Sequence, residues 1–164
     1  MENVFDYMRP MTIVGLISDT HGLLRREAVA ALAGVDRILH AGDVGRPEIL
    51  DALRAIAPVT VVRGNVDTSS WADALPYDTV VFIDGFNIYM LHSLREMTMD
   101  PKAARMDVVV SGHSHKPVIE TVNDVLYVNP GSAGPQRFTL PISVGFLRLS
   151  PKAPIEAWLK TLDG

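Results

Sequence analysis

Seven side chains with oxygen or nitrogen donors follow short apolar runs along this chain of 164 residues. They are Asp19, His21, Asp43, Asn65, His92, His113 and His115. Carboxylates, amide oxygens and imidazoles are ligands that divalent transition metals accept, and the chain has no cysteine whose thiolate could compete. Together the seven side chains suffice to hold two metal ions.

The first two candidates, Asp19 and His21, stand two residues apart at the end of an apolar run. In extended backbone such side chains point to the same side, so we expect both to bind one ion. Taken alone, Asp19 would more readily cap a turn or helix, because Asp-Thr-His-Gly suits a turn before a helix. The other donor positions favour ligation.

Asp43 and Asn65 each follow a glycine. The carboxylate of Asp43 projects from bare backbone and could bridge two cations, since its two oxygens screen the repulsion between ions ~3.5–4 Å apart. The amide oxygen of Asn65 ligates without adding charge, which leaves the site cationic enough to hold phosphate. The alternative for both is an ordinary turn.

Four of the five histidines occupy such positions. A single histidine after a strand is more often a hydrogen-bonded structural residue than a ligand, but His92, His113 and His115 recur with the same placement as His21. The pattern predicts ligation by these four. His40 lies inside a buried run, and we expect it to pack or hydrogen-bond there.

The first part of the chain alternates strand-like and helical patterns. Strands are expected at 12–18, 35–40 and 58–62, and helices at 25–33 and 46–56. This order predicts parallel strands with right-handed crossovers, whose carboxyl ends share one edge where ligands bind. Asp19, Asp43 and Asn65 each end one of these strands, so they should converge.

The second part reads as shorter strands. They are expected at 79–83, 86–91, 108–111, 118–122, 125–128, 142–149 and 155–161. Asp84-Gly85 and Asn123-Asp124 are compact enough for hairpin turns. We expect these strands to form a second sheet packed on the first, with helices outside.

Composition narrows the function classes. A formal net charge of −4 with scattered basic residues argues against a groove for long nucleic acids. No apolar run reaches the roughly 20 residues of a membrane-spanning helix, so no membrane partner is expected. The lack of cysteine favours a reducing compartment, and the cytoplasm is the expected location.

The first ten residues differ from the rest. Residues 1–10 carry two acidic side chains and no apolar core, unlike a secretory leader. They are expected to form a disordered arm, unless Met11 is the true initiator. Residues 11–164 have a length typical of a single domain.

Taken in order, the donor-bearing segments resemble those of the calcineurin-like metallophosphoesterases. The similarity is to the small single-domain bacterial and archaeal phosphodiesterases, a branch that also contains the eukaryotic retromer scaffold subunit. It extends from Met11 to about Leu149 and includes a further element without a predicted ligand, Asn129-Pro130-Gly131-Ser132. The resemblance implies an α/β fold, a four-layer α/β/β/α sandwich of two mixed sheets flanked by helices.

The resemblance also implies roles for the candidate ligands. His115 would join Asp19, His21 and Asp43 on one ion, while Asn65, His92 and His113 would join Asp43 on the other. Asp43, Asn65 and His92 would act in catalysis by positioning metal and phosphate. The ions would be two divalent transition metals, with manganese favoured over nickel, iron, cobalt and zinc.

Five positions bear on what the site would hydrolyse. Larger phosphatases of the superfamily carry a catalytic histidine after the asparagine, whereas this chain has Val66. A site without that acid resembles the diesterases, so we expect hydrolysis of a small phosphate diester by a hydroxide bound between the metals. Ser93 stands where relatives often have glycine and another histidine, which puts the substrate preference in doubt. Arg63, Asn129 and Arg137 are the candidates for contacts to phosphate or to the ligands.

Two other functions compete with a diesterase. One is a protein-interaction scaffold of the same fold with weak or no catalysis, and the other is a phosphomonoesterase. A nuclease is weakened by the missing basic groove. Relatives form dimers or tetramers, so the resemblance implies a homodimer or homotetramer for this chain.

Overall fold

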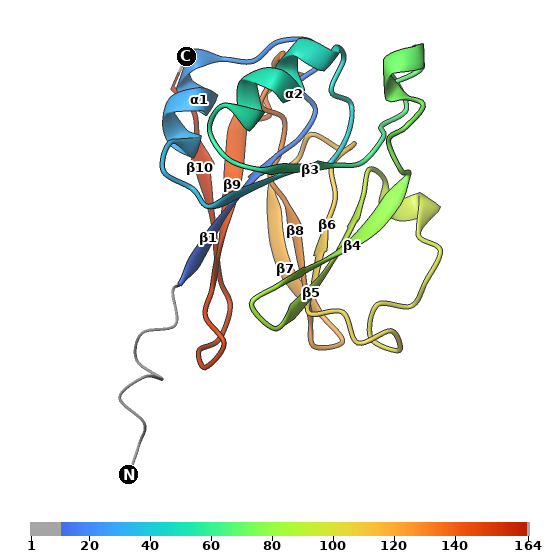
Figure 1. Cartoon of the computed structure of the whole chain (residues 1–164), viewed down its shortest axis with the longest axis vertical. Coiled ribbons are helices and arrows are strands. Elements are labelled where there is room, and N and C mark those ends of the chain that lie inside the picture. The colour runs from blue at the N-terminus through green and yellow to red at the C-terminus, as the bar shows by residue number, and fades with distance from the viewer. Residues whose placement is uncertain (1–10, 164) are drawn as a thin grey trace.

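The computed structural model describes residues 11–163, so the arm expected at residues 1–10 lies outside the described residues. Two five-stranded sheets stack face to face, and two α-helices cover the outer side of the first sheet (Figure 1). The expected α/β fold with two mixed sheets is confirmed. Neither helix of this part of the chain has the length and apolar character needed to cross a bilayer.

The first sheet has the strand order β10-β9-β1-β2-β3. Its strands are β1 (Thr12–Ile17), β2 (Arg37–His40), β3 (Val59–Val61), β9 (Ser143–Leu149) and β10 (Glu156–Thr161). β1, β2 and β3 run parallel, as the strand-helix alternation predicts, while β9 and β10 pair antiparallel. The four buried residues at the end of β1 fit a strand covered on both faces.

The crossovers are the helices α1 (Arg26–Leu32) and α2 (Pro47–Arg54). Proline at the first turn of α2 is tolerated because its missing N–H would have no partner there. α1 lies so close to β1 that a Cβ added at Gly15 would meet Leu32 at 2.5 Å. Both helices bury their apolar sides in one core cluster with the outer face of the first sheet.

The second sheet has the order β4-β5-β6-β8-β7. Its strands are β4 (Asp78–Ile83), β5 (Phe86–Leu91), β6 (Val108–Val110), β7 (Val118–Val122) and β8 (Val125–Asn129). β5, β6 and β8 run parallel, and β4 and β7 close the sheet as antiparallel edges through the two expected hairpin turns. Short 3-10 helices stand at Ser70–Ala72 and Leu94–Glu96.

The placement of the last two strands was wrong in the sequence analysis. The strands expected at 142–149 and 155–161 belong to the first sheet, because β9 pairs with β1 along five residue pairs. β9 is buried on both faces, with Phe146 in the outer cluster and Leu147 in the core between the sheets. A short apolar run cannot reveal which of two sheets it joins, since both offer apolar partners.

The outer face of the second sheet is covered differently from that of the first. Within residues 11–163 the segment over it contains one 3-10 helix and loop, rather than an α-helix. Met97, Met99 and Met106 from this segment pack against Tyr89 and Leu91. Unbranched methionine side chains suit an irregular layer of this kind.

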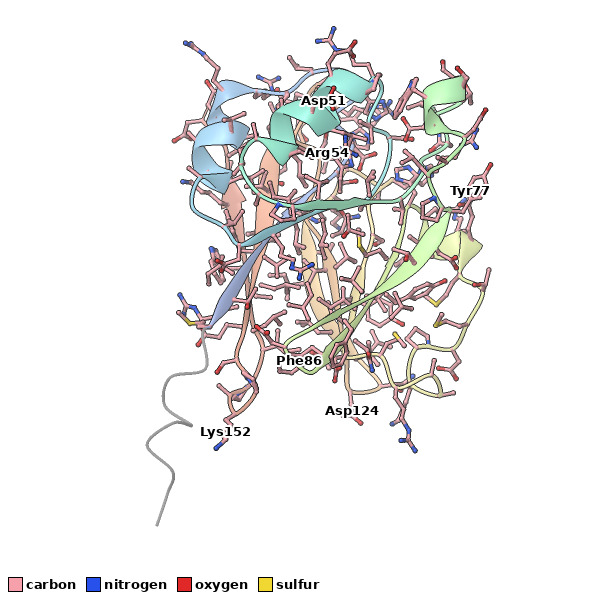
Figure 2. The ribbon with its side chains drawn as sticks, viewed as in Figure 1. Asp51, Arg54, Tyr77, Phe86, Asp124 and Lys152 are labelled. Carbon is pink, nitrogen blue, oxygen red and sulfur yellow. The ribbon has the colours of Figure 1, made fainter. Side chains whose placement is uncertain are left out.

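Six parallel strands, three from each sheet, end at the same edge of the sandwich. The upper end in Figure 2 is this edge, and α2, with Asp51 and Arg54, lies there. Phe86, Asp124 and Lys152, beside or within the hairpin turns, lie at the opposite end. The carboxyl ends of parallel strands are where such folds place their sites.

Candidate metal centre

All seven predicted ligands lie in loops that leave the carboxyl ends of parallel strands. Asp19, Asp43 and Asn65 follow β1, β2 and β3, while His92 follows β5. His113 and His115 follow β6. Residues from both sheets therefore meet at one place, although they are up to 96 positions apart in the chain.

The side chains gather into two groups of three. Asp19, His21 and His115 place one ligand atom each within 4.8 Å of one another. Asp43, His92 and His113 do the same. These groups divide the side chains as the family resemblance implies. Because distances of this size fit donors around a common ion, each group is a candidate metal site.

The carboxylate of Asp43 lies between the two groups. Its Oδ2 is 3.1 Å from Nε2 of His92 in one group and 3.6 Å from Nε2 of His21 in the other. Its Oδ1 accepts a hydrogen bond from the backbone N–H of Val66 at 3.0 Å. This position is the one a bridging carboxylate needs.

The close approach of two loops depends on Gly64. A Cβ added there would lie 2.1 Å from both the backbone nitrogen and Oδ1 of Asp43. Any side chain at this position would push Asp43 out of the site. The glycine before Asn65 is therefore required by packing against Asp43, in addition to any turn.

The backbone at five of the ligands is left-handed. Asp19, His21, Asp43, His113 and His115 have φ angles between 45° and 71°. The expectation that Asp19 and His21 share one side in extended backbone was wrong, although their side chains do meet. Non-glycine residues adopt this region at a cost, and such strain is concentrated at functional sites.

The tautomer of His92 follows from its partners. Its Nδ1 lies 2.8 Å from the carbonyl oxygen of Ala41, which can only accept a hydrogen bond. Nδ1 therefore carries a hydrogen, and Nε2, the nitrogen that can bind a cation when the ring is neutral, lies on the side of Asp43. Such a carbonyl contact is typical of histidines that bind metals.

Asn65 joins the second group through His113. The side-chain oxygen of Asn65 lies 3.2 Å from Nδ1 of His113. An amide oxygen and an imidazole nitrogen at this distance can face one cation. The structure thus brings together Asn65 and His113, two side chains that the family resemblance assigns to one ion.

Buried atoms without partners indicate that the site fits cations. Among the described residues, Oδ1 of Asp19 and Nε2 of His92 are buried and have no hydrogen-bond partner. Oδ1 of Asp19 lies 3.3 Å from Nε2 of His115. Polar atoms left unpaired in the interior are costly, and a metal ion would satisfy them.

The charge state of the carboxylates also suits cations. Burial raises the pKa of Asp19, whereas contacts with His115 and His21 lower it. The lowering effect is the larger one, so the pKa of Asp19 falls well below its usual range. Burial likewise raises the pKa of Asp43, while His92 and the Val66 N–H lower it to a net decrease. Both carboxylates are therefore ionised near neutral pH.

Asp67 is a supporting residue that the sequence analysis did not single out. Its buried carboxylate accepts hydrogen bonds from the backbone N–H groups of Val44, Gly45 and Gly64. It thereby holds the Asp43 loop against the Asn65 loop. Nothing in the sequence separates this aspartate from a turn residue, because its partners are backbone groups of distant positions.

Ser18 and Ser132 hold Asp19 in a similar way. The Ser18 hydroxyl donates to Oδ2 of Asp19 at 2.7 Å, and the His113 backbone N–H donates to the same oxygen at 3.1 Å. The Ser132 hydroxyl donates to the Asp19 carbonyl at 3.1 Å. These bonds leave Oδ1 of Asp19 as the atom turned to the site.

His40 lies behind the site, with both ring nitrogens in contact with neighbours. The Gly42 N–H donates to its Nδ1 at 3.2 Å, so Nε2 carries the hydrogen and faces the Thr20 hydroxyl at 3.0 Å. Burial lowers the pKa of His40 to about 4. The expectation that His40 hydrogen-bonds in a buried run is confirmed.

The three candidates for phosphate or supporting contacts differ in their surroundings. The Asn129 amide donates to the Gly112 carbonyl and to Ser114, which stabilises the loop that bears His113 and His115. Arg63 donates to the Asp67 carbonyl at 2.7 Å and stacks over Tyr77. Arg137 is exposed in the loop before β9.

Comparison with known proteins identifies the family. The model of the calcineurin-like phosphoesterase superfamily domain matches residues 11–152. The chain is 35% identical to a probable metallophosphoesterase of Methanothermobacter thermautotrophicus over 149 residues, which cover 84% of this chain and 86% of the relative. This chain belongs to the calcineurin-like phosphoesterase superfamily.

Two further similarities concern a named activity and a metal. A phosphodiesterase of Methanocaldococcus jannaschii is 27% identical over 72% of this chain and 82% of its own length. Vps29 from Entamoeba histolytica, solved in complex with Zn²⁺, has a TM-score of 0.73 at 20% identity, covering 93% of this chain and 100% of that one. At that identity the second match establishes the fold alone. The family and the two residue groups together indicate divalent-metal binding.

Proposed function

We propose that this chain is a dinuclear metal-dependent phosphodiesterase that hydrolyses a small phosphate diester. The observation that carries the proposal is the pair of His and Asp groups that adjoin at Asp43. Asp19, His21 and His115 would hold one ion, and Asn65, His92 and His113 the other, with Asp43 shared. Manganese is the favoured metal, and Zn²⁺ in the Entamoeba protein keeps zinc among the candidates.

The bound ions would supply Lewis acidity, which activates water near neutral pH and neutralises charge on the phosphate oxygens. Asp19 and Asp43 contribute about −2 against +4 for two divalent ions, so the site would keep roughly +2 for an anionic substrate. His92, oriented by the Ala41 carbonyl, and Asn65, beside His113, would fix the position of the phosphate. The backbone contact of His92 and the side-chain contact of Asn65 restrict motion that would otherwise slow the reaction.

A diester is favoured over a monoester by the residue after Asn65. Val66 turns its backbone N–H to Asp43 and cannot protonate a leaving alcohol. The M. jannaschii relative named a phosphodiesterase supports the same substrate class. The leaving group would therefore depart as a stabilised alkoxide or take its proton from water. Rates for aryl methyl phosphates should fall as the pKa of the phenol rises, and rates that do not change would contradict this dependence.

The leading test combines metal analysis with an assay. The purified chain should contain up to two divalent ions and hydrolyse an aryl phosphate diester, and activity should disappear after chelation and return with Mn²⁺. Asp43→Asn should lower turnover by orders of magnitude, while circular dichroism shows an intact fold. Asp51→Asn, on the exposed side of α2, is the matched control. Full activity in metal-free protein would refute the proposal.

A phosphomonoesterase and a catalytically weak scaffold are the alternatives. The monoesterase is distinguished by comparing aryl phosphate monoesters with diesters under the same conditions. The scaffold is favoured only if the metal-loaded chain is inert towards both with manganese, nickel, cobalt, iron and zinc. A cytoplasmic location remains part of this proposal, on the ground that the sequence has no cysteine.

A further inference from the structure

The two sheets present four edge strands, and one of them lacks protection. Soluble proteins usually guard an edge by shortness or by charge. β3 has three residues, β10 carries Glu156 and Lys160, and β7 has Glu120 at its centre. β4 is six residues long and has no charged side chain from Thr79 to Ile83.

The backbone of β4 offers free hydrogen-bonding groups at two positions. Asp84 and Gly85 both have positive φ, as in the two-residue turn that closes a hairpin on a hydrogen-bonded pair, here Ile83 with Phe86. Pairs alternate along an antiparallel ladder, so the N–H and C=O groups of Val80 and Phe82 point away from β5. No residue from 11 to 163 hydrogen-bonds to these groups.

The side chains of the same two residues are exposed and apolar. Val80 is 43% exposed and Phe82 is 68% exposed. They lie on the outer face of the sheet, in register with Tyr89 and Asn87 of β5. Figure 1 shows β4 in light green at one side of the second sheet. An uncharged strand with open backbone and exposed apolar side chains is a surface for pairing with another strand.

We propose that β4 is a self-association surface, on which a second copy of this chain adds its own β4 antiparallel across a two-fold axis at Val81. This register places Val80 opposite Phe82 of the second copy, and Phe82 opposite its Val80. The outward peptide groups of both positions then form two hydrogen-bonded pairs, each exchanging both bonds. Two five-stranded sheets become one continuous sheet.

A second copy fits this edge because the strand is complementary to itself. A two-fold interface requires each residue to accept its partner in reverse order. The aromatic ring of Phe82 against the β-branched side chain of Val80 is a favourable cross-strand pair, and it occurs twice. Charged residues meet only at the two ends of the paired segment, where this register brings Asp78 next to Asp84 of the second copy at some cost. The assembly uses no residue of the metal centre, so it stands independently of the proposed function.

The first experiment measures mass by size-exclusion chromatography with light scattering. The full chain should elute at twice its 17.9 kDa. Phe82→Lys should shift it to the monomer mass, because two ammonium groups would face the pairing strand. Phe82→Pro should do the same, since it removes only an N–H that points away from β5. Ile119→Lys, an exposed apolar position on the opposite edge strand β7, should leave the dimer intact.

The second experiment traps the register. The chain has no cysteine, so Val81→Cys can form only an intermolecular disulfide. Across the two-fold axis, Cα atoms of a non-hydrogen-bonded pair lie ~4.5 Å apart, within the range a disulfide spans. Val81→Cys should form a covalent dimer under mild oxidation, and adding Phe82→Lys should prevent it. Glu120→Cys, at the centre of β7, is the matched control and should stay monomeric.

Three results would overturn the proposal. One is a native chain that remains at 17.9 kDa at its highest soluble concentration. Another is a dimer that survives Phe82→Lys in protein shown to be folded by circular dichroism. The third is a Glu120→Cys variant that cross-links as fast as Val81→Cys.

Discussion

Single residues hold the metal centre in backbone conformations that most side chains avoid. Left-handed φ angles at Asp19, His21 and Asp43 are stable only because neighbouring groups fix them. Ser18 fixes the Asp19 carboxylate, and Gly64 makes room for Asp43. The functional side chains are therefore as dependent on small neighbours as on their own identity.

Gly64→Ala should abolish metal binding at the Asp43 position. The added Cβ would meet Asp43 at 2.1 Å, which displaces the shared carboxylate and costs about 1–3 kcal/mol of stability. Gly34→Ala is the control, because it has a φ of 83° but no atom within 4 Å of the added Cβ. That variant should lose about 1–2 kcal/mol from backbone strain alone. Isothermal titration calorimetry with Mn²⁺ distinguishes the two variants, because Gly34→Ala should still bind the ion and Gly64→Ala should not.

His40 should make stability depend on pH below about 6.5. Its pKa falls from an unfolded value of 6.5 to about 4 in the native state, because burial disfavours the charged ring despite Asp19, Asp67 and Asp43 nearby. The unfolded chain thus binds a proton first as pH falls, and stability decreases between about pH 6.5 and pH 4. The loss reaches about 3 kcal/mol.

Urea unfolding of metal-free protein at pH 7.5 and pH 5 measures the loss of stability that the titration of His40 causes. His40→Asn keeps an acceptor for the Gly42 N–H but cannot titrate, so its stability should change less between the two pH values. The difference between the two proteins isolates His40 from the other histidines. Equal pH dependence in both would mean that His40 is already charged in the native state or neutral in the unfolded one.

At the scale of elements, the site depends on loops that meet after the strands have ended. The strand-helix alternation up to β3 predicts that Asp19, Asp43 and Asn65 share an edge, since parallel strands leave no other choice. The histidines after β5 and β6 come from the other sheet, and their convergence on the same edge followed from family resemblance alone. The contacts of Asp67 could not be predicted, because its partners are backbone N–H groups.

Asp67→Ala should separate the loops after β2 and β3. Three backbone donors, at Val44, Gly45 and Gly64, would lose a charged acceptor in the interior. The expected loss is roughly 3 kcal/mol or more of stability, with weaker metal binding because Asp43 and Asn65 move apart. Asp73→Ala, an exposed partner of Arg63 at 3.9 Å, should change stability little. Thermal unfolding and Mn²⁺ titration test both variants, and similar behaviour would contradict the role of Asp67.

At the scale of the whole molecule, most of the architecture could be predicted from apolar periodicity. Ten strands and both helices appear within a few residues of their expected bounds, because buried β-branched runs and hairpin turns are local features. The assignment of β9 and β10 to the first sheet could not be predicted, since it depends on which strand of either sheet has an unpaired edge. A helical layer was expected over the second sheet, but a loop lies there. Methionine side chains from this irregular segment cover Tyr89, so no α-helix is needed to bury it.

Metal binding should stabilise the whole fold, because its ligands come from both sheets. An ion that binds only the native state adds about 2.7 kcal/mol when its concentration is a hundred times the dissociation constant. For a chain of this size the melting temperature should rise by roughly 5–11 °C. Differential scanning calorimetry with Mn²⁺ or with a chelator measures the shift. A variant with both Asp19→Asn and Asp43→Asn retains the shape of the site without its charge, so it should melt at the same temperature in both conditions. If the melting temperature of the native chain is the same with Mn²⁺ and with a chelator, the two groups of ligands do not bind the metal.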